Sequence, residues 1–288
     1  MYNLFRMHIY RTLKSKSTLV LGILLVVFTF LHLGLGYIVF EDPLNIQAGG
    51  LYIQSNGSDI SLTPDLVHQF FIQGNSALLI LLTIFTVLMT NSDITKGFVK
   101  NIYGMFEDKG KLVLAKWCAV MSSVTLVYLV TSIVSLGLAI LCYRTSYESG
   151  NWDLYLIEFV VVYIGCIAMM TMVFLITSLF KSSAGGMVIG LVIASGILQS
   201  IERLIDVIIA KLSGATGKET IMAFTGLAEE GARKFFRISD YCIDNVFISF
   251  SPAMEQSDIA RTVIVSAAYA LIGLGLAVLL AKKRDVKI

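Results

Sequence analysis

Apolar runs long enough to cross a lipid bilayer recur along the chain, and they constrain its fold more than any other feature. A membrane-crossing helix needs about 20 mostly apolar residues, and residues 17–40 exceed that length without one Asp, Glu, Lys or Arg. Of the 288 residues, 56% are hydrophobic and only 15% are charged, which excludes an ordinary soluble domain. We therefore expect an all-α membrane protein that crosses the bilayer several times.

The pattern predicts a single transmembrane domain over residues 1–288 with six transmembrane helices. We place these helices at residues 17–40, 75–91, 114–143, 154–180, 184–201 and 262–281. An N-terminal amphipathic helix at residues 1–16 should rest in the membrane interface, because apolar residues gather on one of its faces. We also expect the fifth span to continue as an amphipathic helix whose apolar face carries Ile201, Leu204, Ile205, Ile208, Ile209 and Leu212.

The distribution of Lys and Arg predicts the orientation. Residues 1–16, the segment 92–113 and the C-terminal tail are rich in these residues, whereas residues 41–74 contain none. Because cytoplasmic loops carry the excess of Lys and Arg, both termini and the 92–113 segment should be cytoplasmic. The long insert at 213–258, between the fifth and sixth helices, is then extracellular. This layout predicts a multi-pass protein of the cell membrane.

Neither a catalytic nor a metal-binding group of residues emerges from the sequence. His8, His32 and His68 are scattered over the predicted interface, membrane and exterior. Glu158 lies near the outer end of the fourth span, where we expect it to reach water. The four cysteines lack a CxxC spacing. We favour free thiols, although a bond between Cys142 and Cys242 stays open. We therefore expect a non-enzymatic chain without bound cofactor or metal.

The connection between the second and third spans is longer than a turn requires. Residues 91–117 carry five lysines, yet they also contain large apolar residues such as Phe98, Ile102 and Phe106, which a purely solvated loop would not need. Gly97 and Gly104 leave room for only a short helix, which would be unstable in isolation. Such a helix must pack against other cytoplasmic segments of this chain or against a separate protein.

This segment resembles the hallmark of ABC-2 type transporter membrane subunits, of the kind found in bacterial peptide, lantibiotic and drug exporters. The family motif has an acidic residue, Gly four positions later and Lys-Asn three positions after that. Here these are Asp93, Gly97 and Lys100-Asn101, and Ala115-Lys116 follows at the third span. Two departures are Asp93 in place of the usual Glu and Phe98 where Thr is common.

The resemblance implies that the segment carries a coupling helix that docks onto a cytoplasmic ATPase. The residues that would couple to the ATPase are Asp93, Gly97, Phe98, Lys100, Asn101, Ile102 and Phe106. Two ATPase subunits would bind ATP and Mg, and a second membrane subunit, identical or homologous, would complete a pathway through the lipid. Nucleic acid is not an expected partner. The expected activity is ATP-driven export of an amphipathic cargo, with a peptide as the favoured class.

The second and fifth spans would line this pathway, because they carry more hydroxyl and amide groups than lipid contact requires. The candidates are Asn75, Thr83, Thr86, Thr90, Met187, Ser195 and Gln199. Several of these hydroxyls can instead bond to their own helix. Two other functions stay open: a gradient-driven carrier or channel, and a membrane sensor or scaffold that recruits a cytoplasmic partner. A carrier would need ionisable residues within its spans, for which only His32 and Glu158 are near candidates.

Overall fold

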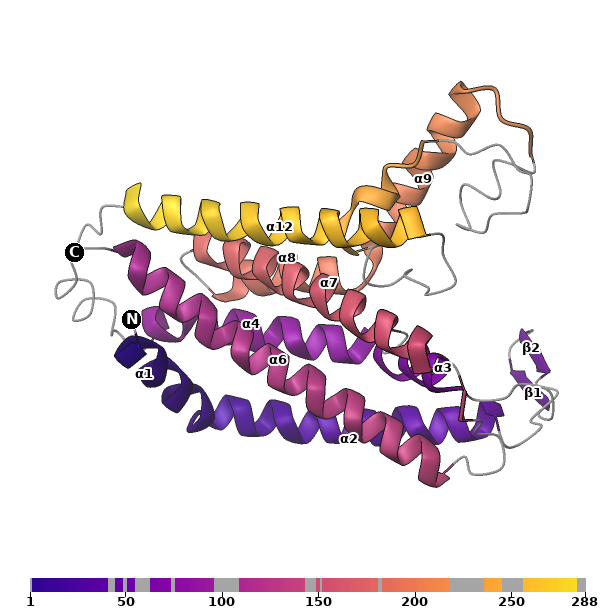
Figure 1. Cartoon of the computed structure of the whole chain (residues 1–288), viewed down its shortest axis with the longest axis horizontal. Coiled ribbons are helices and arrows are strands. Elements are labelled where there is room, and N and C mark those ends of the chain that lie inside the picture. Colours follow the sequence, from indigo (N-terminus) through magenta and orange to yellow (C-terminus); the bar gives the residue numbers. More distant parts are fainter. Residues whose placement is uncertain are drawn as a thin grey trace.

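The computed structural model describes most of the chain and is dominated by helices that lie side by side (Figure 1). The described residues are 2–40, 45–48, 51–54, 63–73, 76–95, 109–142, 149–150, 152–180, 183–217, 236–244 and 256–283. The elongated helices are α2 (Lys16–Phe40), α4 (Ser76–Thr95), α6 (Lys109–Cys142), α7 (Trp152–Leu179), α8 (Ser183–Ala194) and α12 (Gln256–Lys283). The other elements are α1 (Tyr2–Leu13), β1 (Asn45–Ala48), β2 (Leu51–Gln54), α3 (Pro64–His68), the π-helix η1 (Gln69–Gln73), α9 (Ile197–Leu212) and the short 3-10 helix η2 (Ser239–Tyr241).

Three helices are long and apolar enough to cross a membrane, and the described residues allow up to five such spans. The three are α6, α7 and α12. The other two are bent pairs, α1 with α2 and α8 with α9, which bend by 61° and 52°. The apolar part of α4 within the described residues, Leu78–Ser92, is shorter than these spans. The prediction of a helical bundle is confirmed to the extent that three to five of its helices are long and apolar enough to cross a membrane, which is compatible with a multi-pass membrane protein. The full set of six spans stays a prediction.

Helix α7 is the centre of the bundle, and α4, α6, α8 and α12 pack around it. Small residues bring these helices close. A methyl group added to Gly190 of α8 would lie 2.7 Å from the Thr83 methyl of α4. One added to Gly273 of α12 would lie 3.1 Å from the Met172 sulfur of α7. Both glycines therefore permit close helix contact within the subunit.

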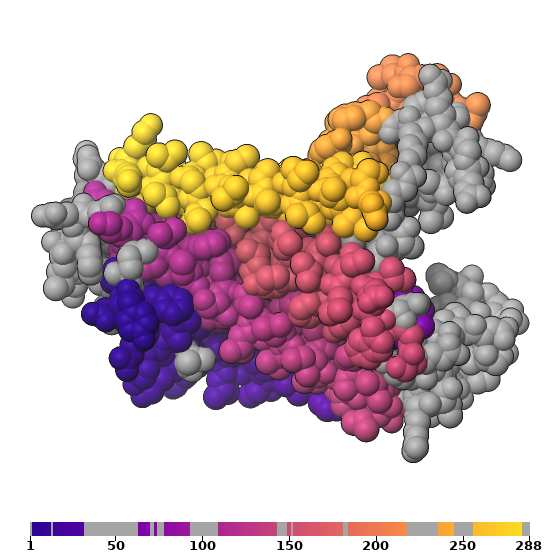
Figure 2. Space-filling model, viewed as in Figure 1, coloured from indigo at the N-terminus to yellow at the C-terminus, as the bar shows by residue number. Residues whose placement is uncertain are grey.

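The outward surface of the bundle is apolar, as lipid contact requires. Helix α12 forms a continuous ridge along one side (Figure 2) and exposes Ile264, Leu271 and Leu279. Helix α2 likewise exposes a series of large apolar side chains, among them Leu19 and Phe30. Exposed apolar surface of this extent is unusual for a soluble monomer but is expected for helices that face a bilayer.

The fifth predicted span is not one continuous helix. The prediction was one helix over residues 184–201 that continues to Leu212, but the helix breaks at Ser195 and Gly196. Gly196 has φ of 73°, a left-handed conformation that side chains with a Cβ rarely adopt. Helix α9 therefore leaves the bundle at an angle to α8, beyond the end of α12 (Figure 1).

The connection between α2 and α4 contains a pair of short strands and a short helical segment. A short helix, α3, precedes the second predicted span and is followed directly by η1. An antiparallel hairpin of β1 and β2 was not predicted, and it pairs Asn45 with Gln54 and Ala48 with Leu51. In the sequence, Gly49-Gly50 separates the two strands, and glycine pairs are favoured in the loops of short hairpins.

Candidate functional site

The residues expected to couple to an ATPase lie almost entirely outside the described residues. Asp93 falls in the last turn of α4, which ends at Thr95. Gly97, Phe98, Lys100, Asn101, Ile102 and Phe106 belong to residues 96–108, which the structure does not describe. What the structure does give is the position of the two helices that flank this segment. The end of α4 and the beginning of α6 lie at the same end of the bundle as α1, called here the α1 end (Figure 1).

The candidate pathway residues on α4 point into the protein. Thr83 and Thr86 are fully buried and Thr90 is nearly so. Thr86 donates to the sulfur of Met170 on α7 at 3.4 Å, and Thr90 donates to the Thr86 carbonyl at 2.6 Å. The hydroxyls of Thr86 and Thr90 thus serve contacts between and within helices, and the role of all three threonines in a pathway stays a prediction.

The candidates beyond α4 are spread along the bend between α8 and α9. Met187 is half-buried on α8, and Ser195 is exposed at the break between the two helices. Gln199 is half-buried on α9 and therefore lies beyond the bend. Asn75 is outside the described residues. The structure thus brings Thr83 against α8 at Gly190, whereas the described candidates Ser195 and Gln199 lie at and beyond the break that follows α8.

A buried polar cluster that the sequence did not reveal lies at the opposite end of the bundle. It joins His68 of α3, Tyr128 of α6 and Glu158 of α7. His68 Nδ1 lies 3.0 Å from Glu158 Oε1, and His68 Nε2 lies 2.9 Å from the Tyr128 hydroxyl oxygen. Gln69 donates to the other Glu158 oxygen at 3.4 Å. The side chains of His68, Tyr128 and Glu158 are each at most 2% exposed, so the cluster is sealed from water.

The hydrogen bonds determine where the cluster holds its protons. The Tyr128 hydroxyl donates its single hydrogen to the Phe159 carbonyl at 3.0 Å, so its oxygen must accept a hydrogen from His68 Nε2. One further proton then lies between His68 Nδ1 and Glu158 Oε1. With this proton on nitrogen the two groups form an ion pair, and with it on oxygen both are neutral. The polar atoms of His68, Tyr128 and Glu158 are hydrogen-bonded in either state, which is the condition for such a cluster to be tolerated.

Aromatic rings enclose the cluster. The His68 ring lies edge-on to Tyr155 at 5.8 Å and to Phe159 at 6.0 Å between ring centroids. The expectation that Glu158 reaches water is therefore wrong, because α3 and these rings cover it. The histidines do stay scattered, but His68 is folded into the bundle. Its contact with Glu158 joins residues 90 positions apart, and no sequence spacing predicts such a contact.

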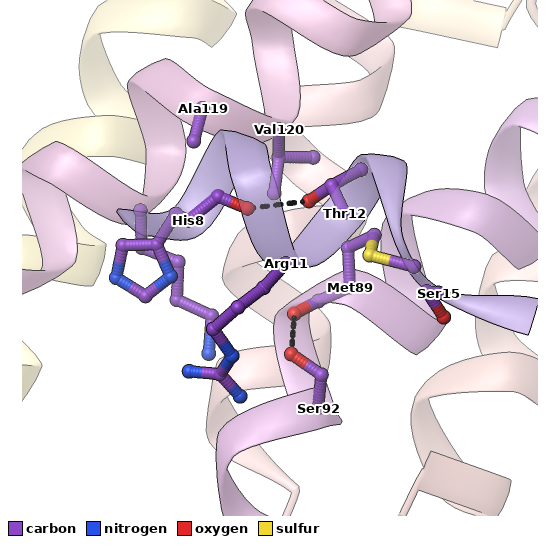
Figure 3. A pocket seen from close by; sticks show the side chains of 9 residues that line it. His8, Arg11, Thr12, Ser15, Met89, Ser92, Ala119 and Val120 are labelled. Carbon is purple, nitrogen blue, oxygen red and sulfur yellow. Dashed lines mark hydrogen bonds between the residues drawn. The ribbon is translucent and has the colours of Figure 1, made fainter. Parts of the chain in front are cut away.

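A small hollow lies at the α1 end, between α1, α4 and α6. Its described lining residues are His8, Arg11, Thr12, Ser15, Met89, Ser92, Lys116, Ala119 and Val120 (Figure 3). Helix α1 is held there because Leu4 packs onto Leu112 and Ala115 at the start of α6. The predicted interfacial helix thus forms one wall of a polar hollow, which the sequence did not predict.

A second polar group joins α9 to η2 beyond the bundle. The carboxylate of Asp206, itself buried, accepts from the backbone N–H groups of Ile238 at 2.6 Å and Ser239 at 3.4 Å. Burial, followed by the neighbouring Asp244 carboxylate, raises the pKa of Glu202 to about 7. Burial also raises the pKa of the Cys242 thiol to about 12. All four cysteines are free thiols.

Known proteins give no further guidance on the function of these sites. No protein-family model matches the chain, and no curated protein matches it. Among the described residues, no group of three His, Cys, Asp or Glu side chains is arranged to hold a metal ion.

Proposed function

We propose that the chain is the membrane subunit of an ATP-binding-cassette exporter. The observation that supports this most directly is the gathering of α1, the end of α4 and the start of α6 at one end of an apolar helical bundle (Figure 1). The segment with Asp93, Gly97 and Lys100-Asn101 joins these two helices. Movement of a partner bound to that segment would therefore act on both helices directly.

In this proposal the chain itself binds no nucleotide. Two cytoplasmic ATPase subunits bind ATP and Mg, and their closure pushes on residues 96–108. The push reaches α4 and α6 and, through the Thr83–Gly190 contact, α8. A second membrane subunit completes the pathway in the bacterial cell membrane, with both termini in the cytoplasm. The cargo is an amphipathic molecule, most consistent with a peptide, because the spans offer isolated hydroxyl groups on apolar surfaces.

Replacement of Ile102 tests the proposed coupling. Ile102→Asp places a charge in a contact that is expected to be apolar, which should lower transport and stimulated ATP hydrolysis by at least about tenfold. Ile102→Leu is the matched control and should keep both activities. The measurements are copurification of the ATPase, ATP hydrolysis and cargo export in reconstituted vesicles. Full-rate transport by an Ile102→Asp complex that retains its ATPase would contradict the proposal.

One structural observation favours a second candidate, a proton-coupled carrier. The His68–Glu158 pair is an ionisable group buried within a membrane bundle, and such groups commonly belong to proton pathways. A carrier would move cargo in vesicles without any ATPase, and an uncoupler that collapses the proton gradient would stop it. The exporter instead requires ATP and is insensitive to the uncoupler over short times. The same vesicles therefore distinguish the two functions.

A further inference from the structure

The hollow at the α1 end has the charge of an anion site. Three of its nine described lining residues are basic or can become so, namely His8, Arg11 and Lys116, and none of the nine is acidic. These groups come from different helices, since His8 and Arg11 belong to α1 whereas Lys116 belongs to α6. The fold itself therefore brings positive charge from two separate segments to one place.

The lining combines hydroxyl groups that bond within their own helices with basic side chains on α1. The Thr12 hydroxyl donates to the His8 carbonyl at 2.9 Å, and the Ser92 hydroxyl donates to the Met89 carbonyl at 2.9 Å. Both hydroxyl hydrogens are thus used within their own helices. The guanidinium of Arg11 and the imidazole of His8 lie beside each other on one side of α1 (Figure 3). A guanidinium has the fork of donors that matches two oxygens of a phosphate group.

The position of the hollow relates it to the edge of the apolar surface. Ser15 lines the hollow, and Leu19 and Val20, which are exposed, follow about one helical turn later on α2. One turn is about 5.4 Å, so the hollow lies where a lipid headgroup would meet the protein. On α1, the Lys14 ammonium stacks over the exposed Tyr10 ring at 4.8 Å, as in helices that rest at a membrane interface.

We propose that this hollow binds a phosphate group, supplied by the headgroup of an anionic phospholipid whose chains run along the exposed side of α2. The innermost space is about the size of one water molecule, which suits one phosphate oxygen while the rest of the headgroup stays at the opening. Arg11 binds the phosphate from α1 and Lys116 binds it from α6. The bound group thereby ties α1 to the start of α6, whether or not the chain is a transporter.

The first experiment measures binding to the full-length chain in detergent by native mass spectrometry. The two probes are phosphatidylglycerol and inorganic phosphate. We expect Arg11→Gln and Lys116→Gln each to weaken binding about tenfold, the effect of one lost hydrogen bond to a charged group. Arg6→Gln and Lys111→Gln are the matched controls, since both residues are exposed on the same two helices and neither lines the hollow. These controls should bind like the unchanged protein.

The outcomes separate the two sources of phosphate. Binding of phosphatidylglycerol alone, with loss only in the Arg11 and Lys116 variants, supports the lipid headgroup. The same pattern with inorganic phosphate supports the phosphate site but assigns it to a soluble ligand. Equal binding by all four variants and the unchanged protein, or no binding of either probe, overturns the proposal.

A second measurement needs no variant and so does not depend on their folding. An amine-acetylating reagent is applied to the unchanged protein with and without phosphatidylglycerol, and the modified lysines are quantified by peptide mass spectrometry. Lys116 should react at least about threefold more slowly with the lipid present, because its ammonium contacts the phosphate. Lys111 is the internal control and should react at the same rate. An unchanged Lys116 rate would overturn the proposal.

Discussion

Tyr128 determines how the buried cluster responds to substitution, because its only hydroxyl hydrogen is used at the Phe159 carbonyl. His68 must then present Nε2–H to Tyr128, and its Nδ1 is free to accept a hydrogen from position 158. A neutral side chain that donates a hydrogen can therefore replace the carboxylate of Glu158. A neutral side chain that cannot donate would leave Nδ1 without a hydrogen bond in a sealed site, at a cost of about 1–3 kcal/mol.

We accordingly predict that Glu158→Gln is tolerated, because its amide donates to His68 Nδ1. His68→Ala should lower stability by about 3–5 kcal/mol, since it leaves the Glu158 carboxylate buried without its partner. The double variant His68→Ala with Glu158→Gln should recover part of that loss. Thermal unfolding of each purified variant in detergent checks this order. Equal loss for Glu158→Gln and His68→Ala would contradict the proton arrangement described here.

At the scale of single residues, the close helix contacts at glycines relate more simply to the sequence than the polar contacts do. Gly190 and Gly273 lie within apolar runs. The absence of a side chain there lets a neighbouring helix approach closely, whichever helix that neighbour is. Glu158 was misjudged because its distance from the end of a span says nothing about what covers that end. Here α3 supplies His68 from a loop segment between two predicted spans, and only the fold brings them together.

At the scale of elements, the apolar pattern located the helices but not the break between α8 and α9. The apolar face of α9 is continuous in sequence with the fifth span, so periodicity alone favours one helix. Gly196 is compatible with either a helix interior or a left-handed turn. Contacts with η2 help position α9, because Asp206 accepts the N–H groups of Ile238 and Ser239. Such a bond to a distant backbone segment leaves no sequence pattern.

The contact between α9 and η2 should weaken as pH rises. The pKa of Glu202 is raised to about 7 in the folded protein, so folding favours its protonated form. The stabilisation is present at acidic pH and is lost as pH rises from the ordinary carboxyl range through about 7. Other groups near Glu202 are Asp206, Asp244, Cys242 and Tyr269, and the two carboxylates oppose its ionisation. We expect faster amide hydrogen exchange at residues 236–244 at pH 8 than at pH 6.

The comparison must allow for the intrinsic pH dependence of amide exchange, so protection factors are compared rather than rates. Glu202→Gln removes the titrating group and should give the same protection at both pH values. Arg203→Gln, which changes the neighbouring charge on α9, should retain the pH dependence. Protection of residues 236–244 that does not change between pH 6 and pH 8 in the unchanged protein would contradict the assignment to Glu202.

At the scale of the whole molecule, the arrangement of helices gives a physical basis for the predicted orientation. The beginning of α1, the end of α4, the start of α6 and the end of α12 lie at one end of the bundle, and α3, the start of α7 and α9 lie at the other (Figure 1). The first end carries Arg11, Lys116 and Lys283. The second end is mixed, since it carries Asp65, Asp153 and Asp206 together with the basic residues Arg203 and Lys211 of α9. Since Lys and Arg are retained on the cytoplasmic side, the first end should face the cytoplasm.

Labelling of single cysteines tests both the orientation and the number of crossings. In a variant that lacks the four native cysteines, Ser149→Cys and Ser213→Cys introduce thiols at exposed positions of the second end. Asn3→Cys and Lys283→Cys do so at exposed positions of the first end. A membrane-impermeant maleimide should label Ser149→Cys and Ser213→Cys on intact cells. It should label Asn3→Cys and Lys283→Cys only after permeabilisation. Labelling of Asn3→Cys and Lys283→Cys on opposite sides would require an odd number of crossings and would exclude the six-span layout.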